Sequence, residues 1–131
     1  MGDAEKARML IGLARRDLAT MLALRNADAI TTDAFGFHGQ QATEKALKAW
    51  LVTLGVEYPF THSLQALFGL VEDAAGPDSI TRFRDLDLLD PYAVEFRYLT
   101  QEETAEQLDK DGLIRDVDEL LCHVDELVSQ E

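Results

Sequence analysis

Several polar side chains are crowded into one stretch of the chain that is otherwise mostly apolar. Residues 34–64, AFGFHGQQATEKALKAWLVTLGVEYPFTHSL, contain His38, Gln41, Glu44, Lys45 and Lys48. If successive residues of a helix lie 100° apart, these five share about one third of its surface, and apolar or small residues take most of the rest. Imidazole, amide, carboxylate and ammonium groups on one face could bind an anion or an amide.

Two interpretations of this polar face are open from the sequence. In the first it is a solvated stripe, in which Glu44 and Lys48 form an i, i+4 ion pair worth a few tenths of a kcal/mol. In the second, Gln41, Lys45 and Lys48 form an edge that binds an anion or an amide. Two lysines and a glutamine on one face of an acidic protein suggest the second interpretation without deciding it.

Other groups of residues that could form a metal or phosphate site do not have the spacing that such sites require. His38, His62 and His123 show no metal-ligand spacing with the single cysteine, Cys122. The chain has no glycine-rich phosphate loop. Asp85, Asp87 and Asp90 lack a calcium loop around them and are expected on a solvated helix face. We therefore expect no metal and no cofactor.

Helical periodicity dominates the elements that must position these residues. Apolar residues spaced three and four apart predict helices over about 3–26, 33–54 and 63–75, and over a last segment from about 102 or 111 to 129. Gly55 suits the end of the second helix and Ser63 the start of the third. A fourth stretch begins near residue 78 and is expected to break at Asp90–Pro91, where a short helix restarts. The sequence thus predicts one all-α domain, residues 1–131, an antiparallel up-and-down bundle of four main helices plus a short fifth.

Charge and hydropathy narrow the classes of partner. The net charge is −13, and the last 31 residues, with two basic and eleven acidic side chains, contribute −9. Such a chain repels polyphosphate at long range, so sequence-independent DNA binding is not expected. No apolar run approaches the length of a membrane helix, and the N-terminus lacks the order of a signal peptide. We expect a cytoplasmic protein without a membrane partner.

The segment FHGQQATEKALKAWLVTLGVEYPFTHSLQALF resembles the HEPN domain, a family named for its occurrence in higher eukaryotes and prokaryotes. The later AVEFRYL is similar to the family's RYP element, with Leu99 where proline is usual. The resemblance implies a five-helix bundle that often dimerises and acts on or near nucleotides and RNA. Many members are ribonuclease toxins, and many are encoded beside a minimal nucleotidyltransferase that acts as the antitoxin.

The ribonuclease members carry Arg, four to six residues and then His on a late helix, and this chain departs from that pattern. Arg115 and His123 are the nearest pair, with seven residues between them. Metal-independent RNA cleavage needs a general acid or base and a cation for the developing charge. Side chains eight positions apart on a helix do not converge, and His123 is expected to be exposed. The sequence therefore favours a non-catalytic module over an enzyme.

The resemblance assigns a binding role to residues that match the family's motifs. They are Gln41, Glu44, Lys45, Lys48, His62, Arg97 and Tyr98. We expect a nucleotide-related ligand or RNA, a minimal nucleotidyltransferase partner, or both, and a homodimer that pairs through the less charged first or second helix, near Met21 or Leu24. The alternatives are a ribonuclease toxin with an altered Arg/His site and a purely structural helical partner subunit.

Overall fold

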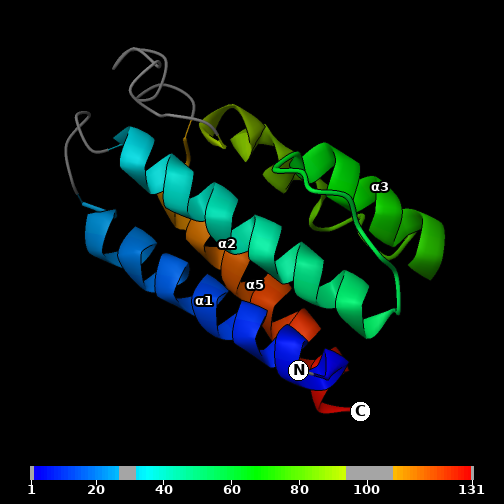
Figure 1. Cartoon of the computed structure of the whole chain (residues 1–131). Helices are drawn as coiled ribbons and strands as arrows, with labels where there is room; N and C mark the ends of the chain where they lie inside the picture. Colours follow the sequence, from blue (N-terminus) through cyan, green and yellow to red (C-terminus); the bar gives the residue numbers. More distant parts are fainter. Residues whose placement is uncertain (1, 27–31, 94–107, 131) are drawn as a thin grey trace.

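The computed structural model describes residues 2–26, 32–93 and 108–130. Within these ranges it contains helices and no strand, so the predicted all-α class is confirmed. The elements, shown in Figure 1, are α1 (Asp3–Leu24), α2 (Thr32–Thr53), α3 (Leu64–Ala75), the 3₁₀ helix η2 (Arg84–Tyr92) and α5 (Lys110–Ser129). None of the described helices combines the length and apolarity of a membrane span.

Helix α2 is the centre of the bundle. It contacts α1, α5, α3 and η2, while α1 and α5 also pack on each other. In Figure 1, α1, α2 and α5 lie along one another, and α3 lies on another side of α2. The core between them is closed by large side chains with almost no exposure, including Phe35, Trp50, Phe68, Phe83 and Tyr92. The apolar two thirds of α2 seen in the sequence are therefore buried on several sides.

The helix ends follow local chemistry. The Ser63 hydroxyl accepts a hydrogen bond from the Ala66 amide, as expected of an N-cap. Gly55, just past the end of α2, has a φ of 72°, which favours glycine. Helix α5 begins at Lys110, where the Asp109 carboxylate accepts from the Gly112 amide. The helix end expected at Leu54 and the helix start expected at Asp111 are therefore right to within one residue. The alternative start near residue 102 is wrong, because Leu108 and Asp109 are not helical.

The expected break at Asp90–Pro91 is wrong. A 3₁₀ helix runs through both residues to Tyr92, and the Ala93 amide bonds to the Asp90 carbonyl across the proline at 3.0 Å. The fixed φ of proline is compatible with a helix, although Pro91 has no amide hydrogen to donate within it. Tyr92 is held because its ring lies on the backbone of Gly36, where a Cβ would collide with it. The short helix expected beyond this point extends outside the described residues.

The expected dimer residues on α1 also need correction. Met21 is fully buried in the core, and Leu24 is half-buried against it. The large apolar side chains that α1 exposes are instead Met9 and Leu22, at 45% and 47%. The sequence pattern predicted apolar side chains along this helix, but it could not tell which of them face inward, and the dimer itself stays a prediction.

Candidate functional site

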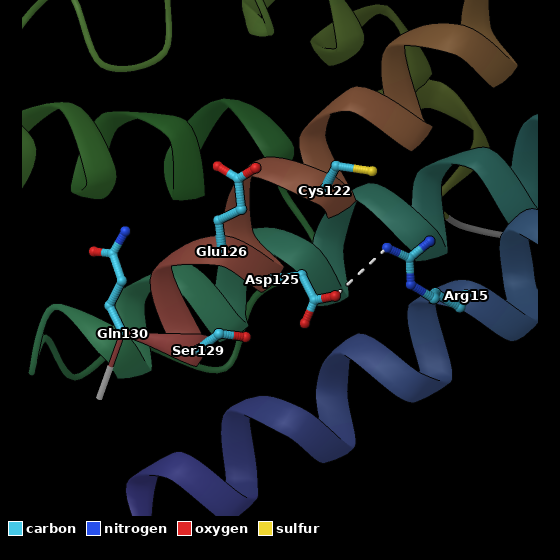
Figure 2. A pocket seen from close by; sticks show the side chains of 6 residues that line it. All are labelled: Arg15, Cys122, Asp125, Glu126, Ser129 and Gln130. Carbon is cyan, nitrogen blue, oxygen red and sulfur yellow. Dashed lines mark ion pairs between the residues drawn. The ribbon is translucent and has the colours of Figure 1, made fainter.

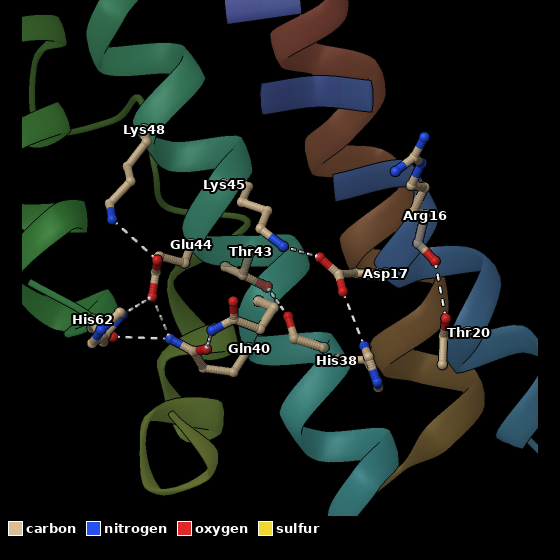
Figure 3. Close-up of polar contacts among 12 residues, drawn as sticks. Arg16, Asp17, Thr20, His38, Gln40, Thr43, Glu44, Lys45, Lys48 and His62 are labelled. Carbon is tan, nitrogen blue, oxygen red and sulfur yellow. Dashed lines mark hydrogen bonds and ion pairs between the residues drawn. The ribbon is translucent and has the colours of Figure 1, made fainter. Parts of the chain in front are cut away.

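Glu44, on α2, is the centre of a cluster of polar side chains (Figure 3). Its carboxylate accepts hydrogen bonds from Gln40 Nε2 at 3.1 Å, His62 Nδ1 at 2.9 Å and Lys48 Nζ at 3.1 Å. The Glu44 side chain is 6% exposed, Lys48 14% and His62 51%. We call Gln40, Gln41, Glu44, Lys48 and His62 the Glu44 cluster. It joins a buried carboxylate to a half-exposed imidazole.

The charge of Glu44 is stabilised by its partners. Burial alone would raise the pKa of this carboxyl, but hydrogen bonds from Gln40, His62 and Lys48, with the positive charge of Lys48, outweigh burial and lower the pKa. The carboxylate is thus ionised at neutral pH and accepts a hydrogen bond from the Nδ1–H group of His62. A neutral His62 ring then presents Nε2 as an acceptor.

The segment that carries His62 is held to the helices at several points. We call residues 54–63, the non-helical connection between α2 and α3, the His62 arm. Gln40 Nε2 donates to the His62 carbonyl at 2.9 Å, and Gln41 Nε2 donates to Gln40 Oε1 at 2.6 Å. These bonds occupy both polar ends of the Gln40 amide, which is fully buried. Gln40 is therefore a positioning residue for the arm.

Asp90 holds the other end of the arm. Its carboxylate accepts from the amides of Leu64 at 2.6 Å and Gln65 at 3.1 Å, the first residues of α3. An acceptor at this place satisfies amides that have no partner within the helix. The expectation that Asp90 lies on a solvated helix face is therefore wrong. Asp85, by contrast, is exposed.

A second cluster joins α2 to α1. Asp17 accepts from Lys45 Nζ at 2.7 Å and lies 2.9 Å from His38 Nδ1. The exposed fractions of the side chains are 11% for Asp17, 24% for Lys45 and 31% for His38. We call these three residues the Asp17 cluster. Figure 3 shows it on the opposite side of α2 from His62.

The two clusters rule out a simple form of either interpretation of the polar stripe. It is not a solvated stripe, because Glu44 is buried and Lys48 is mostly covered. Nor is it a bare cationic edge, because a carboxylate neutralises each lysine. What α2 presents is a mixed set of donors and acceptors.

The predicted binding residues fall into three groups. Gln41, Glu44, Lys48 and His62 come together in the Glu44 cluster. Lys45 belongs to the Asp17 cluster instead. Arg97 and Tyr98 lie outside the described residues, so their expected binding role stays a prediction.

The residues that support the two clusters were harder to predict from the sequence. Gln40 could have been found, since it lies one turn before Glu44, where an amide can reach the carboxylate. Asp17 and Asp90 could not, because their partners are 28 and 26 positions away along the chain. Only the packing of whole elements brings them to α2 and to α3.

Three hollows of the described surface are lined by residues outside both clusters. One hollow, of about 430 Å³, lies between α1 and α5, and Figure 2 shows its lining by Arg15, Cys122, Asp125, Glu126, Ser129 and Gln130. Arg15 reaches the carboxylates of Asp118 and Asp125, each at 3.8 Å. In the part of the chain that is described, no group of three or more His, Cys, Asp or Glu side chains could hold a metal ion.

Arg115 and His123 do not form a pair. Arg115 is 67% exposed and lies 3.6 Å from Asp116. His123 is half-buried rather than exposed as expected, with its ring against Trp50 and Phe83. The arginine beside it is Arg82, whose Nη2 lies 3.3 Å from His123 Nδ1. Burial, reinforced by the charge of Arg82, lowers the pKa of His123.

Comparison with known proteins now identifies the family. The model of the HEPN domain matches residues 7–127, nearly the whole chain. No curated protein and no solved structure matches the chain significantly. The match begins in α1 and ends in α5, and so spans both clusters and the His62 arm. The chain belongs to the HEPN domain family.

Proposed function

We propose that this HEPN domain is a non-catalytic module that binds a nucleotide-related ligand at the Glu44 cluster. The observation that supports it is the combination of a buried carboxylate, a mostly covered lysine and a half-exposed imidazole fixed by hydrogen bonds. Preorganised polar groups beside solvent are characteristic of binding sites, since they lose little freedom when a ligand arrives.

The chemistry of the cluster narrows the ligand. A bare anion would gain little, because Glu44 already neutralises Lys48. A ligand with both donors and acceptors fits better, because an amide, an ammonium and an imidazole can each take a complementary group. A nucleotide offers such groups on its base and ribose and adds an anionic phosphate. Lys48 has N–H groups beyond the one directed at Glu44 to meet that phosphate.

A protein partner belongs to the same proposal. Family membership makes a minimal nucleotidyltransferase the first partner to test, and a homodimer through the exposed face of α1 the second. The acidic α5 surface is the less suitable interface between two copies, because like charges repel on close approach. Co-purification with such a nucleotidyltransferase, and sedimentation of Met9→Glu and Leu22→Glu variants, would test these two interactions.

A ribonuclease remains the second candidate, and the contact between Arg82 and His123 favours it. The two side chains meet in space although they are 41 positions apart in the sequence. A histidine whose pKa is lowered is neutral at pH 7 and can act as a base, and an arginine can stabilise phosphorane charge. However, Asp118, Glu119 and Glu126 line the same recess and would repel RNA phosphates. We therefore place binding before cleavage.

A titration with adenosine monophosphate tests the proposed function. We expect saturable binding by calorimetry, weakened by His62→Gln, which removes the half-exposed imidazole of the Glu44 cluster. His38→Gln is the matched control, because it removes the corresponding imidazole of the Asp17 cluster and should leave binding unchanged. Equal effects of the two substitutions would contradict the location of the site. Cleavage of single-stranded RNA that is lost on His123→Ala would favour the second candidate instead.

A further inference from the structure

One aromatic side chain of the His62 arm stands almost entirely in solvent. Phe60 is 94% exposed, whereas the other exposed large apolar side chains of the described residues lie between 36% and 47%. Nothing in the core requires a phenylalanine at this position. A side chain that contributes so little to packing is available for another role.

The backbone on both sides of Phe60 is fixed. Two residues later, His62 is held by its side chain to Glu44 and by its carbonyl to Gln40. Two residues earlier, the half-buried Tyr58 packs against the core, with the ammonium groups of Lys6 and Lys48 each 5.5 Å from its ring centroid. The intervening Pro59 restricts the chain further. The exposed ring is thus presented from a tethered segment.

Phe60 and His62 form a corner of two rings. Their centroids are 5.5 Å apart, and their planes are inclined at 72°. A flat heteroaromatic ligand that stacks on the face of Phe60 would present its edge toward the imidazole of His62. His62 Nε2 can accept a hydrogen bond from such an edge when the ring is neutral and donate one when it is protonated. This geometry suits a planar group with polar edges better than an aliphatic side chain.

We propose that Phe60 is a stacking platform for the nucleobase of the ligand, with His62 at the base edge and Lys48 toward the phosphate. The inference rests on the proposed function, and it adds that the base, rather than the phosphate alone, is recognised. Base stacking on an aromatic side chain tolerates different bases, since every base has a π face. Discrimination between bases would therefore have to come from His62 and its neighbours.

The test compares two ligands that differ in the base. Adenosine monophosphate and ribose 5-phosphate share the sugar and the phosphate, so their affinities for the wild-type chain isolate the contribution of the base. We expect Phe60→Ala to weaken binding of adenosine monophosphate by about 5- to 150-fold and to leave binding of ribose 5-phosphate unchanged. Phe60→Trp should retain the affinity, and its indole fluorescence should be quenched as the base stacks, above the constant signal of the buried Trp50.

The controls separate stacking from other roles. Leu88→Ala removes an apolar side chain that is 45% exposed on η2 and should change neither affinity. An oligoadenylate of about eight nucleotides distinguishes a free nucleotide from single-stranded RNA as the ligand. If the oligoadenylate binds more tightly than adenosine monophosphate, and Phe60→Ala weakens that binding, the ligand is single-stranded RNA. Circular dichroism checks that each variant is folded.

Four results would overturn the proposal that Phe60 is a stacking platform. First, Phe60→Ala could bind adenosine monophosphate as tightly as the wild type does. This result would exclude the stacking role of Phe60 but would be compatible with the proposed function. Second, the substitution could weaken the binding of both ligands equally, which would indicate that the ring holds the His62 arm in place. Third, it could weaken only the binding of a nucleotidyltransferase partner, which would indicate that the ring contacts that protein. A wild-type chain that binds none of the three ligands would contradict the proposed function as well.

Discussion

The Glu44 and Asp17 clusters use the same chemistry to join different kinds of structure. In each, a carboxylate lies between a lysine Nζ and a histidine Nδ1, at 3.1 and 2.9 Å for Glu44 and at 2.7 and 2.9 Å for Asp17. Asp17 joins α1 to α2, whereas Glu44 joins α2 to the non-helical His62 arm. Glu44 also has a buried amide partner, Gln40, on its own helix.

That difference decides how much each cluster contributes to the placement of the elements that it joins. Helices α1 and α2 are already held by buried apolar residues, among them Ile11, Leu18 and Met21. The Asp17 cluster adds to an interface that would form without it. The His62 arm buries little apolar surface near its tip, so its placement depends on the hydrogen bonds of Gln40 and Glu44. A polar contact therefore determines geometry only where apolar packing leaves it undetermined.

The largest effect is expected from Glu44→Gln, which keeps the shape of the side chain and removes its charge. Lys48, only 14% exposed, would lose its counter-ion. We expect the free energy of unfolding to fall by about 3 kcal/mol, measured with urea, and the arm to become sensitive to proteolysis. Glu57→Gln removes the same charge from an exposed position of the arm and should change stability by less than about 0.5 kcal/mol. If the two variants are equally stable, the cluster does not have the role assigned to it.

The same variant should alter the response to acid. Because the pKa of Glu44 is lowered by folding, its ionised form stabilises the protein above the unfolded-state pKa, and this contribution is lost as the pH falls through the folded-state pKa. Wild-type stability should therefore decline more steeply below about pH 4.5 than that of Glu44→Gln. Parallel curves for the two proteins would show that other carboxyl groups control acid unfolding.

A smaller loss of stability is expected from Asp17→Asn. Lys45 and His38 are 24% and 31% exposed, so both can turn to water when the carboxylate is lost. The free energy of unfolding should fall by about 1 kcal/mol, and the Glu44→Gln effect should add to it, because the clusters share no partner. A larger loss for Asp17→Asn than for Glu44→Gln would reverse the comparison drawn above.

The smallest effect is expected on the pKa of His123, the histidine that lies beside an arginine instead of a carboxylate. Burial first, and then the charge of Arg82, lower the pKa of His123, so its ring should titrate in nuclear magnetic resonance spectra with a midpoint below 6.5. Arg82→Gln should raise that midpoint only part of the way, since burial persists. Arg84→Gln is the control, because Arg84 pairs with Glu72. A wild-type midpoint above 6.5 would contradict the combined effect of burial and Arg82 on this ring, and an unchanged midpoint in Arg82→Gln would contradict the contribution of Arg82.

Most of the fold follows from apolar periodicity and capping residues. The long helices were predictable because their apolar stripes extend over many turns, and Ser63 and Gly55 mark the boundaries of α3 and α2. The 3₁₀ helix η2 was not, because Leu86, Leu88 and Leu89 in a short run do not distinguish helix types. Tertiary contacts of Asp90 and Tyr92 then carry it through a proline that the sequence suggested as a break.

The candidate site was predictable only in part. The bond between Glu44 and Lys48 follows from their spacing on one helix. The pairing of Lys45 with Asp17 does not, because it depends on how α1 and α2 are aligned. The Glu44–His62 contact likewise depends on the path of the arm, and the sequence offered no way to derive it. Residue types indicated which side chains could do chemistry, and packing decided which of them meet.

The capping of α3 has a consequence for local unfolding. A helix of 12 residues is barely stable alone, so α3 depends on its packing and on the acceptors that Ser63 and Asp90 offer to its first turn. Because Asp90 belongs to η2 and Ser63 to the arm, the arm, α3 and η2 should open and close as one cooperative unit, while α1, α2 and α5 stay folded. In hydrogen exchange, amides of these three segments would then share one opening free energy, below that of the three-helix core.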